Sequence, residues 1–465
     1  MFDNRDNIDF AHTDIRYLFG SIFFPTLLGM VFNMAFIFTD GIFVGHGLGG
    51  QGLAAINLIC PIMMLINGLG MMLGTGVSVV AAIHLSQGNV KAARINVTQA
   101  FATGIAAAVA LGLVCYLFPD TVLRLLGVDG GIYDAAREYY LWFLPTCLLN
   151  MIITIGLFAI RLDGSPRYAM MSNVVAAIVN GVLDYLFIFP MHWGLMGASL
   201  ATDIGGLVGA VMVACYMFGK AKTLRFYRLK WSGTSLRLMA RNVGYMAKVG
   251  VSGLVGEVAV AVMVLAGNLM FIRYLGDDGV AAYGIACYLF PIVYMVCSAV
   301  AQSAQPIISF NYGAGAGGRV RRTLRFSLAI AVALGLLVTA VFMLFAPAVV
   351  SCFLDSGEAV HGMASHGLPY FATGYLFMAV NICVVGYLQS IERAGAAIFF
   401  TLCRGIIFLV AAFVLLPRVW GVEGLWLAVP AAELLTTVCI AAGFLFRKNG
   451  DKSNKIIKTG TKLNN

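Results

Sequence analysis

Leu48-Gly49-Gly50-Gln51-Gly52-Leu53-Ala54-Ala55 returns in altered form, about 227 residues later, as Leu275-Gly276-Asp277-Asp278-Gly279-Val280-Ala281-Ala282. When the two copies are aligned, Asp40, which lies eight residues before the first copy, falls opposite Gly267. A duplicated scaffold with an ionisable group in one half only predicts two similar lobes, one of which carries a proton or cation site.

The composition indicates a membrane protein. Hydrophobic residues make up 60% of the chain and charged residues 11%, and the mean hydropathy is +0.90, which excludes a soluble globular fold. Apolar stretches long enough to cross a bilayer as helices recur along the chain. We therefore predict an all-α integral membrane protein with twelve transmembrane helices, near residues 18–44, 53–83, 96–118, 139–160, 168–190, 196–218, 245–272, 280–310, 326–349, 368–390, 396–416 and 422–446.

The internal repeat sets the domain organisation. Gly88-Asn89-Val90-Lys91 matches Gly318-Arg319-Val320-Arg321, and Gly194-Leu195-Met196-Gly197 matches Gly421-Val422-Glu423-Gly424. Each half holds six expected spans, an even number, so both copies enter the membrane in the same orientation. We predict two pseudo-symmetric six-helix bundles around a central cavity. The expected parts are an N-terminal lobe (1–218), a basic cytoplasmic linker (219–244), a C-terminal lobe (245–446) and a basic cytoplasmic tail (447–465).

Basic residues are distributed unevenly between the two sides of the expected membrane. One side carries the linker, the tail and most other Lys and Arg residues, whereas the other has only Arg124, Arg137, Arg273 and Arg418. Because Lys and Arg near helix ends are retained in the cytoplasm, both termini are predicted inside, in the cytoplasmic (inner) membrane. The net charge of +9 then reflects topology and contact with anionic membrane lipids, and no nucleic-acid partner is expected.

No motif indicates enzymatic chemistry. Nearly all of the ten cysteines fall within apolar spans and none forms a CxxC pair. HExxH, GxxxxGK and GxSxG arrangements are absent from the sequence. We therefore expect neither an enzyme nor a cofactor.

Polar residues inside three N-terminal spans indicate a cation site. Asn33 and Asp40 share one face of the first span, the fifth span holds Asn173, Asn180 and Asp184, and the sixth holds Thr202. Helical rise places Asp40, Asp184 and Thr202 at a common depth in the outer half of the bilayer, with Asn180 about one turn deeper. Such oxygens suit Na⁺, and two nearby carboxylates also suit a single shared proton. The alternative is that the two acids lie at solvated helix ends.

These motifs resemble the multidrug and toxic compound extrusion (MATE) transporters, over nearly the whole chain. The shared motifs are D-x-x-F-V-G at 40–45, N-G-x-x-D at 180–184 and Gln305-Pro306-Ile307-Ile308-Ser309-Phe310-Asn311-Tyr312-Gly313-Ala314. The pattern is most similar to the DinF-like and MepA-like branch, which implies a cation site for H⁺ or Na⁺ formed by Asp40, Asn180, Asp184 and Thr202. The chain departs from another branch, because Glu257 matches its first acid but the span 368–389 contains no Asp.

The resemblance implies a secondary active antiporter that exports lipophilic, cationic compounds in exchange for H⁺ or Na⁺ by alternating access. We expect small-molecule substrates, lipid contacts and a monomer. Arg404 is a charged residue within the second lobe. It is interpreted as forming a structural ion pair with Glu257 or Glu433, or alternatively as contacting substrate. The competing functions are a lipid-linked oligosaccharide flippase and a receptor or channel without coupled transport. The candidate cavity residues are Asn33, Phe36, Met151, Asn173, Glu257, Tyr283 and Arg404.

Overall fold

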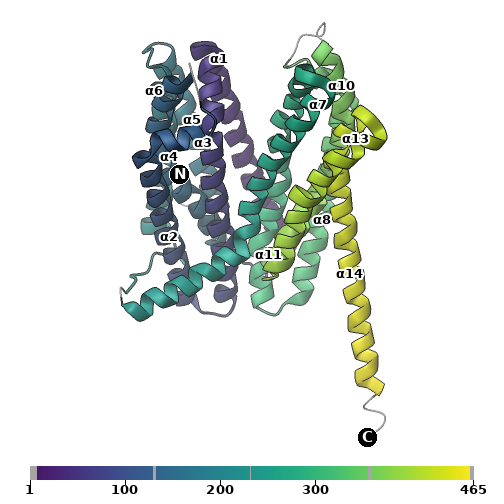
Figure 1. Ribbon diagram of the computed structural model, residues 1–465. Coiled ribbons are helices and arrows are strands. Elements are labelled where there is room, and N and C mark those ends of the chain that lie inside the picture. The colour runs from purple at the N-terminus through teal and green to yellow at the C-terminus, as the bar shows by residue number, and fades with distance from the viewer. Residues whose placement is uncertain (1–7, 129–131, 231, 354–358, 461–465) are drawn as a thin grey trace. The chain divides into compact units, whose positions relative to one another are not determined.

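The computed structural model describes residues 8–128, 132–230, 232–353 and 359–460. All regular structure within these ranges is helical (Figure 1). Some parts of the sequence-based predictions lie outside the described residues: 1–7 and 129–131 of the N-terminal lobe, 231 of the linker, 354–358 of the C-terminal lobe, 461–465 of the tail, and the side chain of Phe36.

The helices follow one another with short connections. The first half of the chain contains α1 (Ile15–Ser86), α2 (Val90–Leu117), α3 (Pro119–Leu125), α4 (Tyr133–Leu162), α5 (Pro166–Ile188), α6 (Gly194–Cys215) and the π-helix η2 (Tyr216–Lys220). The second half contains α7 (Gly233–Gly313), α8 (Gly317–Leu344), α9 (Ala346–Val350), α10 (Ala359–Ala372), α11 (Gly374–Ser390), α12 (Ala394–Leu402), the π-helix η3 (Cys403–Ile407), α13 (Phe408–Trp426) and α14 (Ala428–Gly460).

Two helices are far longer than a membrane is thick. Helix α1 has 72 residues and α7 has 81, so each would exceed about 100 Å in length, against a hydrocarbon core of about 30 Å. Helix α1 contains two separate apolar segments, Ile15–Leu48 and Ala55–Ser86. Helix α7 leaves helical geometry at Gly276, where φ is 67° and ψ is −157°, a conformation that favours glycine. The repeated Leu-Gly motif thus marks a break between apolar segments in the second half.

The apolar helices have the lengths that membrane crossing requires. Nine helical segments among the described residues are long and apolar enough to span, and a bent pair, α10 and α11, gives a tenth with a bend of 41°. The segment 428–444 is a shorter apolar helix. The all-α membrane fold is confirmed, and the number of twelve crossings stays a prediction.

Contacts divide the chain into two compact units. Unit 1 comprises residues 1–261, 298–328 and 386–398, and unit 2 comprises 262–297, 329–385 and 399–465. Within unit 1, α5 packs beside the first segment of α1, whereas α4 packs beside the second, where a Cβ on Gly70 would lie 3.0 Å from that of Thr154; α6 packs against both α4 and α5. The lobe, linker and tail boundaries predicted from the repeat stay predictions.

A pair of glycines supports the internal repeat at the level of backbone geometry. Gly194 has a φ of 61° at the start of α6, and Gly421 has a φ of 59° within α13. These two residues are the ones that the sequence alignment placed opposite each other. A positive φ is tolerated best by glycine, so both copies use this residue for the same local turn.

The chain after α6 is tied to the end of α4. Asp163, which follows α4, accepts hydrogen bonds from the backbone N–H groups of Lys222, Thr223 and Leu224 at 2.8–3.1 Å. The hydroxyl of Tyr216 also donates to Asp163, at 2.8 Å. One carboxylate therefore satisfies several main-chain donors and fixes the beginning of the connection between the two halves.

Candidate functional site

The packing of α1 against α5 brings Asp40 to Asp184. In the first segment of α1, a Cβ on Gly29 would lie 3.5 Å from the Cα of Met170, and about four turns later the ring of Phe43 lies 6.1 Å from that of Tyr185. The two helices therefore run side by side with a nearly constant offset in residue number. Asp40 and Asp184 differ from this offset by less than one helical turn, so they meet across the helix interface.

The two carboxyl groups lie within hydrogen-bonding reach of one another. Asp184 is fully buried, Asp40 is partly buried, and Asn180 donates from Nδ2 to Oδ2 of Asp184 at 2.9 Å. The Oδ1 atoms of both acids are buried without a hydrogen-bond partner in the structure. In the described part of the chain, neither acid forms an ion pair with a base. Three of the four predicted cation-site residues are thus brought together.

Helix α6 places the fourth, Thr202, at the level of this pair. A Cβ on Gly205 would lie 2.5 Å from the Cβ of Asn180, and a Cβ on Gly209 would lie 3.3 Å from that of Ala176. α5 and α6 are therefore antiparallel, and this register places Thr202 of α6 opposite the residues of α5 that directly precede Asp184. The hydroxyl of Thr202 donates to the Ala198 carbonyl of its own helix at 3.1 Å.

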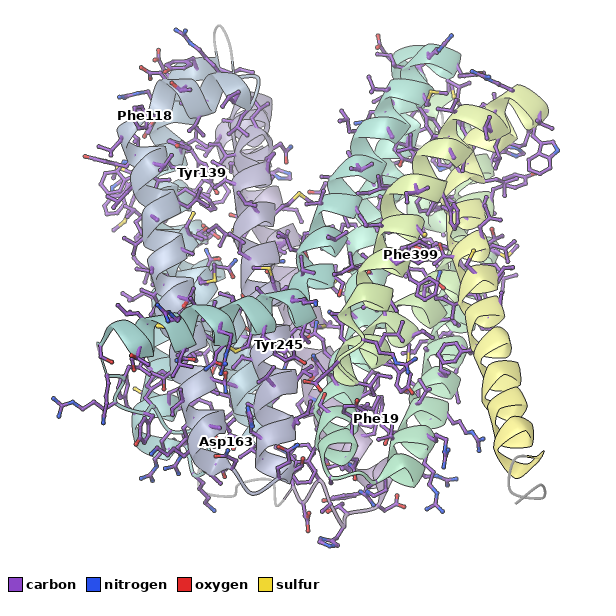
Figure 2. All side chains as sticks on the ribbon, turned by 60° about the horizontal axis from the view of Figure 1, so that its bottom comes forward. Phe19, Phe118, Tyr139, Asp163, Tyr245 and Phe399 are labelled. Carbon is purple, nitrogen blue, oxygen red and sulfur yellow. The ribbon has the colours of Figure 1, made fainter. Side chains whose placement is uncertain are left out.

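A further buried acid, Asp203, was not singled out from the sequence. It is 9% exposed on α6 and accepts a hydrogen bond from the hydroxyl of Thr146 on α4 at 2.5 Å. Tyr139, also on α4 (Figure 2), lies within electrostatic range of Asp40, Asp184 and Asp203. The sequence did carry a signal, because Asp203 is an acid inside an apolar span, directly after a predicted site residue.

The two asparagines of the candidate cavity lie along the same helix pair. Asn33 on α1 and Asn173 on α5 are both partly buried. The Nδ2 atom of Asn173 would be 3.8 Å from a Cβ on Gly29, one turn before Asn33. Both asparagines thus belong to the α1–α5 helix pair, and their contact with substrate stays a prediction.

Two other candidate cavity residues are packed within helix interfaces. Met151 is fully buried on α4. Tyr283 is fully buried in unit 2, where its ring stacks on Phe271 at 4.4 Å and its hydroxyl donates to the Met263 carbonyl at 3.1 Å. In this structure both side chains have core environments, and their substrate role stays a prediction.

Glu257 lies in unit 1, on the first part of α7. It accepts a hydrogen bond from Nδ2 of Asn67 on α1 at 3.0 Å and is partly buried. A Cβ on Gly68 would lie 3.4 Å from the Cβ of Glu257, so the two helices are in close contact here. An amide, and no base among the described residues, faces this acid.

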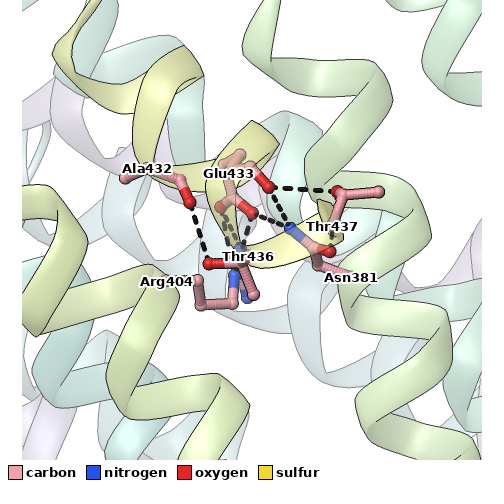
Figure 3. Close-up of polar contacts among 6 residues, drawn as sticks. All are labelled: Asn381, Arg404, Ala432, Glu433, Thr436 and Thr437. Carbon is pink, nitrogen blue, oxygen red and sulfur yellow. Dashed lines mark hydrogen bonds and ion pairs between the residues drawn. The ribbon is translucent and has the colours of Figure 1, made fainter. Parts of the chain in front are cut away.

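Arg404 forms a buried ion pair with Glu433 in unit 2 (Figure 3). Its guanidinium donates from Nη2 and Nε to Oε1 of Glu433 at 2.6 and 3.0 Å, and the two residues are 8% and 4% exposed. Asn381 donates to Oε2 of Glu433 at 2.7 Å and accepts from the Thr437 hydroxyl at 2.9 Å. The ring of Tyr294 lies 5.8 Å from the guanidinium carbon. Of the partners considered for Arg404, the structure selects Glu433.

The unit 1 arrangement can bind a small cation. Two adjacent carboxylates in a poorly solvated place repel one another, so the pair favours uptake of one proton. The same oxygens, with the amide and hydroxyl nearby, belong to the hard ligand class that suits Na⁺. The chemistry available is therefore reversible binding of a cation that neutralises the pair.

A model of one protein family matches the chain twice. The MatE model matches residues 25–186 and 253–414, which together make up more than half of the sequence. This chain belongs to the MATE family of transporters. The two matches also reproduce the duplication found in the sequence, since each falls within one of the two halves.

Two related transporters are similar in sequence over most of this chain. An FAD transporter of Shewanella oneidensis is 24% identical over 88% of this chain and 90% of its own length. The multidrug export protein MepA of Staphylococcus aureus is 21% identical over 91% of this chain and 92% of its own length.

The fold agrees with solved structures of the family. An outward-facing multidrug resistance MATE family transporter of the MOP superfamily superposes with a TM-score of 0.86, at 22% identity, over 95% of this chain and 97% of that one. The similarity confirms a two-lobed helical membrane fold. The chain is therefore a multi-pass membrane transporter, and its family carries out transport, not enzymatic catalysis.

Proposed function

We propose that this MATE transporter is a secondary active exporter of lipophilic, cationic compounds, driven by exchange for H⁺ or Na⁺. The observation that carries the proposal is the buried contact of Asp40 and Asp184, two acids without a basic partner in the described residues and with one unpartnered oxygen each. Such a pair is costly when fully ionised and is relieved by binding a cation.

Coupling follows from differential affinity. A ligand shifts a conformational equilibrium only as far as its affinity differs between the two states. A cation that neutralises Asp40 and Asp184 on the outer side would favour the state that releases the substrate. Substrate entering from the cytoplasm would favour the state in which the acids are ionised, and the inward ion gradient would then drive the cycle. The inner-membrane location and the cytoplasmic termini belong to this proposal.

The test is transport by the purified chain in proteoliposomes. A fluorescent lipophilic cation such as ethidium is followed while a proton gradient and a sodium gradient are imposed separately. We expect movement of the cation with one gradient, and loss of that movement in Asp184→Asn. Asp277→Asn is the matched control, because Asp277 is exposed and lies in the second copy of the repeat. Equal transport by Asp184→Asn and the parent would contradict the proposed coupling site.

A second candidate substrate is a flavin nucleotide. It is favoured by the similarity to the FAD transporter of Shewanella oneidensis. The same vesicles loaded with FAD test it, with flavin fluorescence as the readout. The structure offers less support for this anion, because the guanidinium of Arg404 is already neutralised by Glu433. The same argument weighs against a flippase that handles a pyrophosphate.

A further inference from the structure

The segment that precedes α1 packs against the second copy of the repeat. Residues 9–14 lie directly before α1, and the carboxylate of Asp14 caps that helix by accepting from two backbone N–H groups of its first turn. Phe10 is only 8% exposed, and its ring stacks on that of Phe310, near the end of α7, at 5.6 Å. We call residues 9–14 the strap.

Arg319, in the first turn of α8, holds the strap by its main chain. Its Nη2 atom donates to the carbonyl oxygen of Thr13 at 2.7 Å and to that of Phe10 at 3.2 Å. Its Nε atom donates to Oδ1 of Asn311 at 3.0 Å, and Nδ2 of Asn311 donates to the Phe10 carbonyl at 3.0 Å. Two side chains of the second copy therefore converge on two main-chain acceptors of the strap.

The corresponding position in the first copy of the repeat has a local role. Alignment of Gly88 with Gly318 places Asn89 opposite Arg319. Asn89 caps its own helix, α2, by accepting from a backbone N–H group of the first turn at 3.1 Å. Arg319 instead reaches Thr13, which is 306 residues away in the sequence. Capping of a helix therefore does not explain the arginine.

Helices α1 and α8 are in contact directly beyond the strap. Phe19 of α1 is 1% exposed, and its ring lies edge-on to that of Phe326 of α8 at 5.4 Å. Residues 1–261 and 298–328 both belong to unit 1, so these contacts lie within one compact unit. The span that carries Asp40 thus begins against the second copy of the repeat.

The contact of Arg319 with the strap is suited to reversible opening. Among the residues that the structure describes, no acid forms an ion pair with Arg319, so opening leaves no carboxylate without its counter-charge. Once separated, the guanidinium and the strap carbonyls can bind water in place of one another. A short segment held by a few hydrogen bonds and one ring contact opens at lower cost than a helix packed in the core.

We propose that the strap is a releasable contact between the two copies of the repeat, held by Arg319, that opens in each transport cycle. The inference rests on the proposed exporter function, in which the termini are cytoplasmic. When two repeats alternate access by moving against one another, contacts that join their cytoplasmic ends must separate to admit substrate. The strap is such a contact, because it precedes the first span of one copy and binds the other.

A reducible cross-link across the ring contact tests the opening. Phe10→Cys and Phe310→Cys are combined in the full-length protein, joined with a short bis-methanethiosulfonate reagent and reconstituted in the proteoliposomes. We expect the cross-link to abolish ion-driven movement of ethidium and a reductant to restore it. The parent and the two single variants, treated with the same reagent, are the controls, because the chain has ten native cysteines. Transport at the parent rate by the cross-linked protein would overturn the proposal.

Hydroxyl-radical footprinting provides a measurement that needs no transport. Oxidation of Phe10 is followed by mass spectrometry of the tryptic peptide that ends at Arg16. Arg319→Gln should increase this oxidation several-fold, because the strap loses hydrogen bonds from a charged donor. Arg322→Gln is the matched control, since Arg322 is exposed on the next turn of α8, and it should resemble the parent. Equal oxidation of Phe10 in the two variants would contradict a strap held by Arg319.

The two measurements keep failure of the exporter proposal distinct from failure of this one. If the parent moves no ethidium with either gradient, the exporter proposal fails, and the footprint still decides whether Arg319 holds the strap. If transport persists through the cross-link, the exporter proposal stands and the strap proposal fails. Arg319→Lys is the second variant should Arg319→Gln not fold. It keeps the charge but loses the fork of donors, so its footprint should lie between those of Arg319→Gln and the parent.

Discussion

Buried acids occur in both units, but their surroundings differ. In unit 2, Glu433 receives two donors from Arg404 and one from the side chain of Asn381. In unit 1, Asp184 receives one donor, from Asn180, and has the second acid Asp40 beside it. The first arrangement compensates the negative charge within the protein, whereas the second provides no basic partner among the described residues.

This difference distinguishes a pair whose charge stays constant, Arg404–Glu433, from a pair whose charge can change, Asp40–Asp184. An arginine stays protonated throughout the accessible pH range, so the Arg404–Glu433 pair keeps the same net charge in every state of the cycle. The Asp40–Asp184 pair has no basic partner among the described residues, and in our proposal its charge depends on the cation that it binds. In our proposal, the buried acid of unit 2 serves stability and the acids of unit 1 serve exchange.

The largest expected effect comes from breaking the compensated pair. Arg404→Gln leaves Glu433 buried without a cation, and removal of one partner from such a pair costs about 3–5 kcal/mol. We expect a decrease of this size in the free energy of unfolding. Unfolding in mixed micelles with an increasing fraction of dodecyl sulfate measures it.

The double substitution Arg404→Met with Glu433→Met is the control. It removes both charges, so it should be less destabilising than Arg404→Gln alone, as found when buried ion pairs are replaced by apolar side chains. If the double variant is the less stable of the two, the ion pair is not the source of the effect.

The sequence predicted the fold class, and it singled out the acids that the structure brings together in unit 1, because both depend on local signals. Apolar segments of membrane length gave the helices, and the motifs around Asp40 and Asp184 marked the acids. The partner of Arg404 was not predictable, since Glu257 and Glu433 are equally acidic and the choice depends on packing between helices distant in the sequence. Asp203 was not singled out although it is an acid within an apolar span, and its hydrogen bond from Thr146 depends on packing between α4 and α6.

The next largest effect on the free energy of unfolding is expected where α6 closely approaches α5 beside Asp184. Gly205→Ala would put a Cβ 2.5 Å from that of Asn180, the residue that donates to Asp184. Overpacking of this kind costs about 1–3 kcal/mol, and it should also displace Asn180 and weaken ion-coupled transport. Gly181→Ala on α5 is the matched control, because no atom lies within 4 Å of its Cβ position. A comparable loss in both variants would refute the role of the close contact.

A smaller effect is expected at the edge of the unit 2 cluster. The hydroxyl of Thr437 donates to Oδ1 of Asn381, which in turn orients its amide toward Glu433. Thr437→Val removes this donor and should lower the free energy of unfolding by about 1 kcal/mol in the same micelle titration. Thr437→Ser retains the hydroxyl and should be close to the parent. Transport should be unchanged in both, since this cluster is structural in our proposal.

The smallest effect on stability is expected where the effect on transport is greatest. Asp184→Asn keeps the shape of the side chain and an oxygen that can accept from Asn180, and it removes repulsion from Asp40. We therefore expect the free energy of unfolding to change by less than about 1 kcal/mol, while ion-driven transport is lost. Unfolding and proteoliposome transport are measured on the same preparation, with Glu433→Gln as the opposite case. For Glu433→Gln we expect strong destabilisation, because it leaves Arg404 without its counter-charge. Should Asp184→Asn prove as unstable as Glu433→Gln, the acid of unit 1 would be structural too, and the contrast between a compensated and an exchangeable charge would no longer hold.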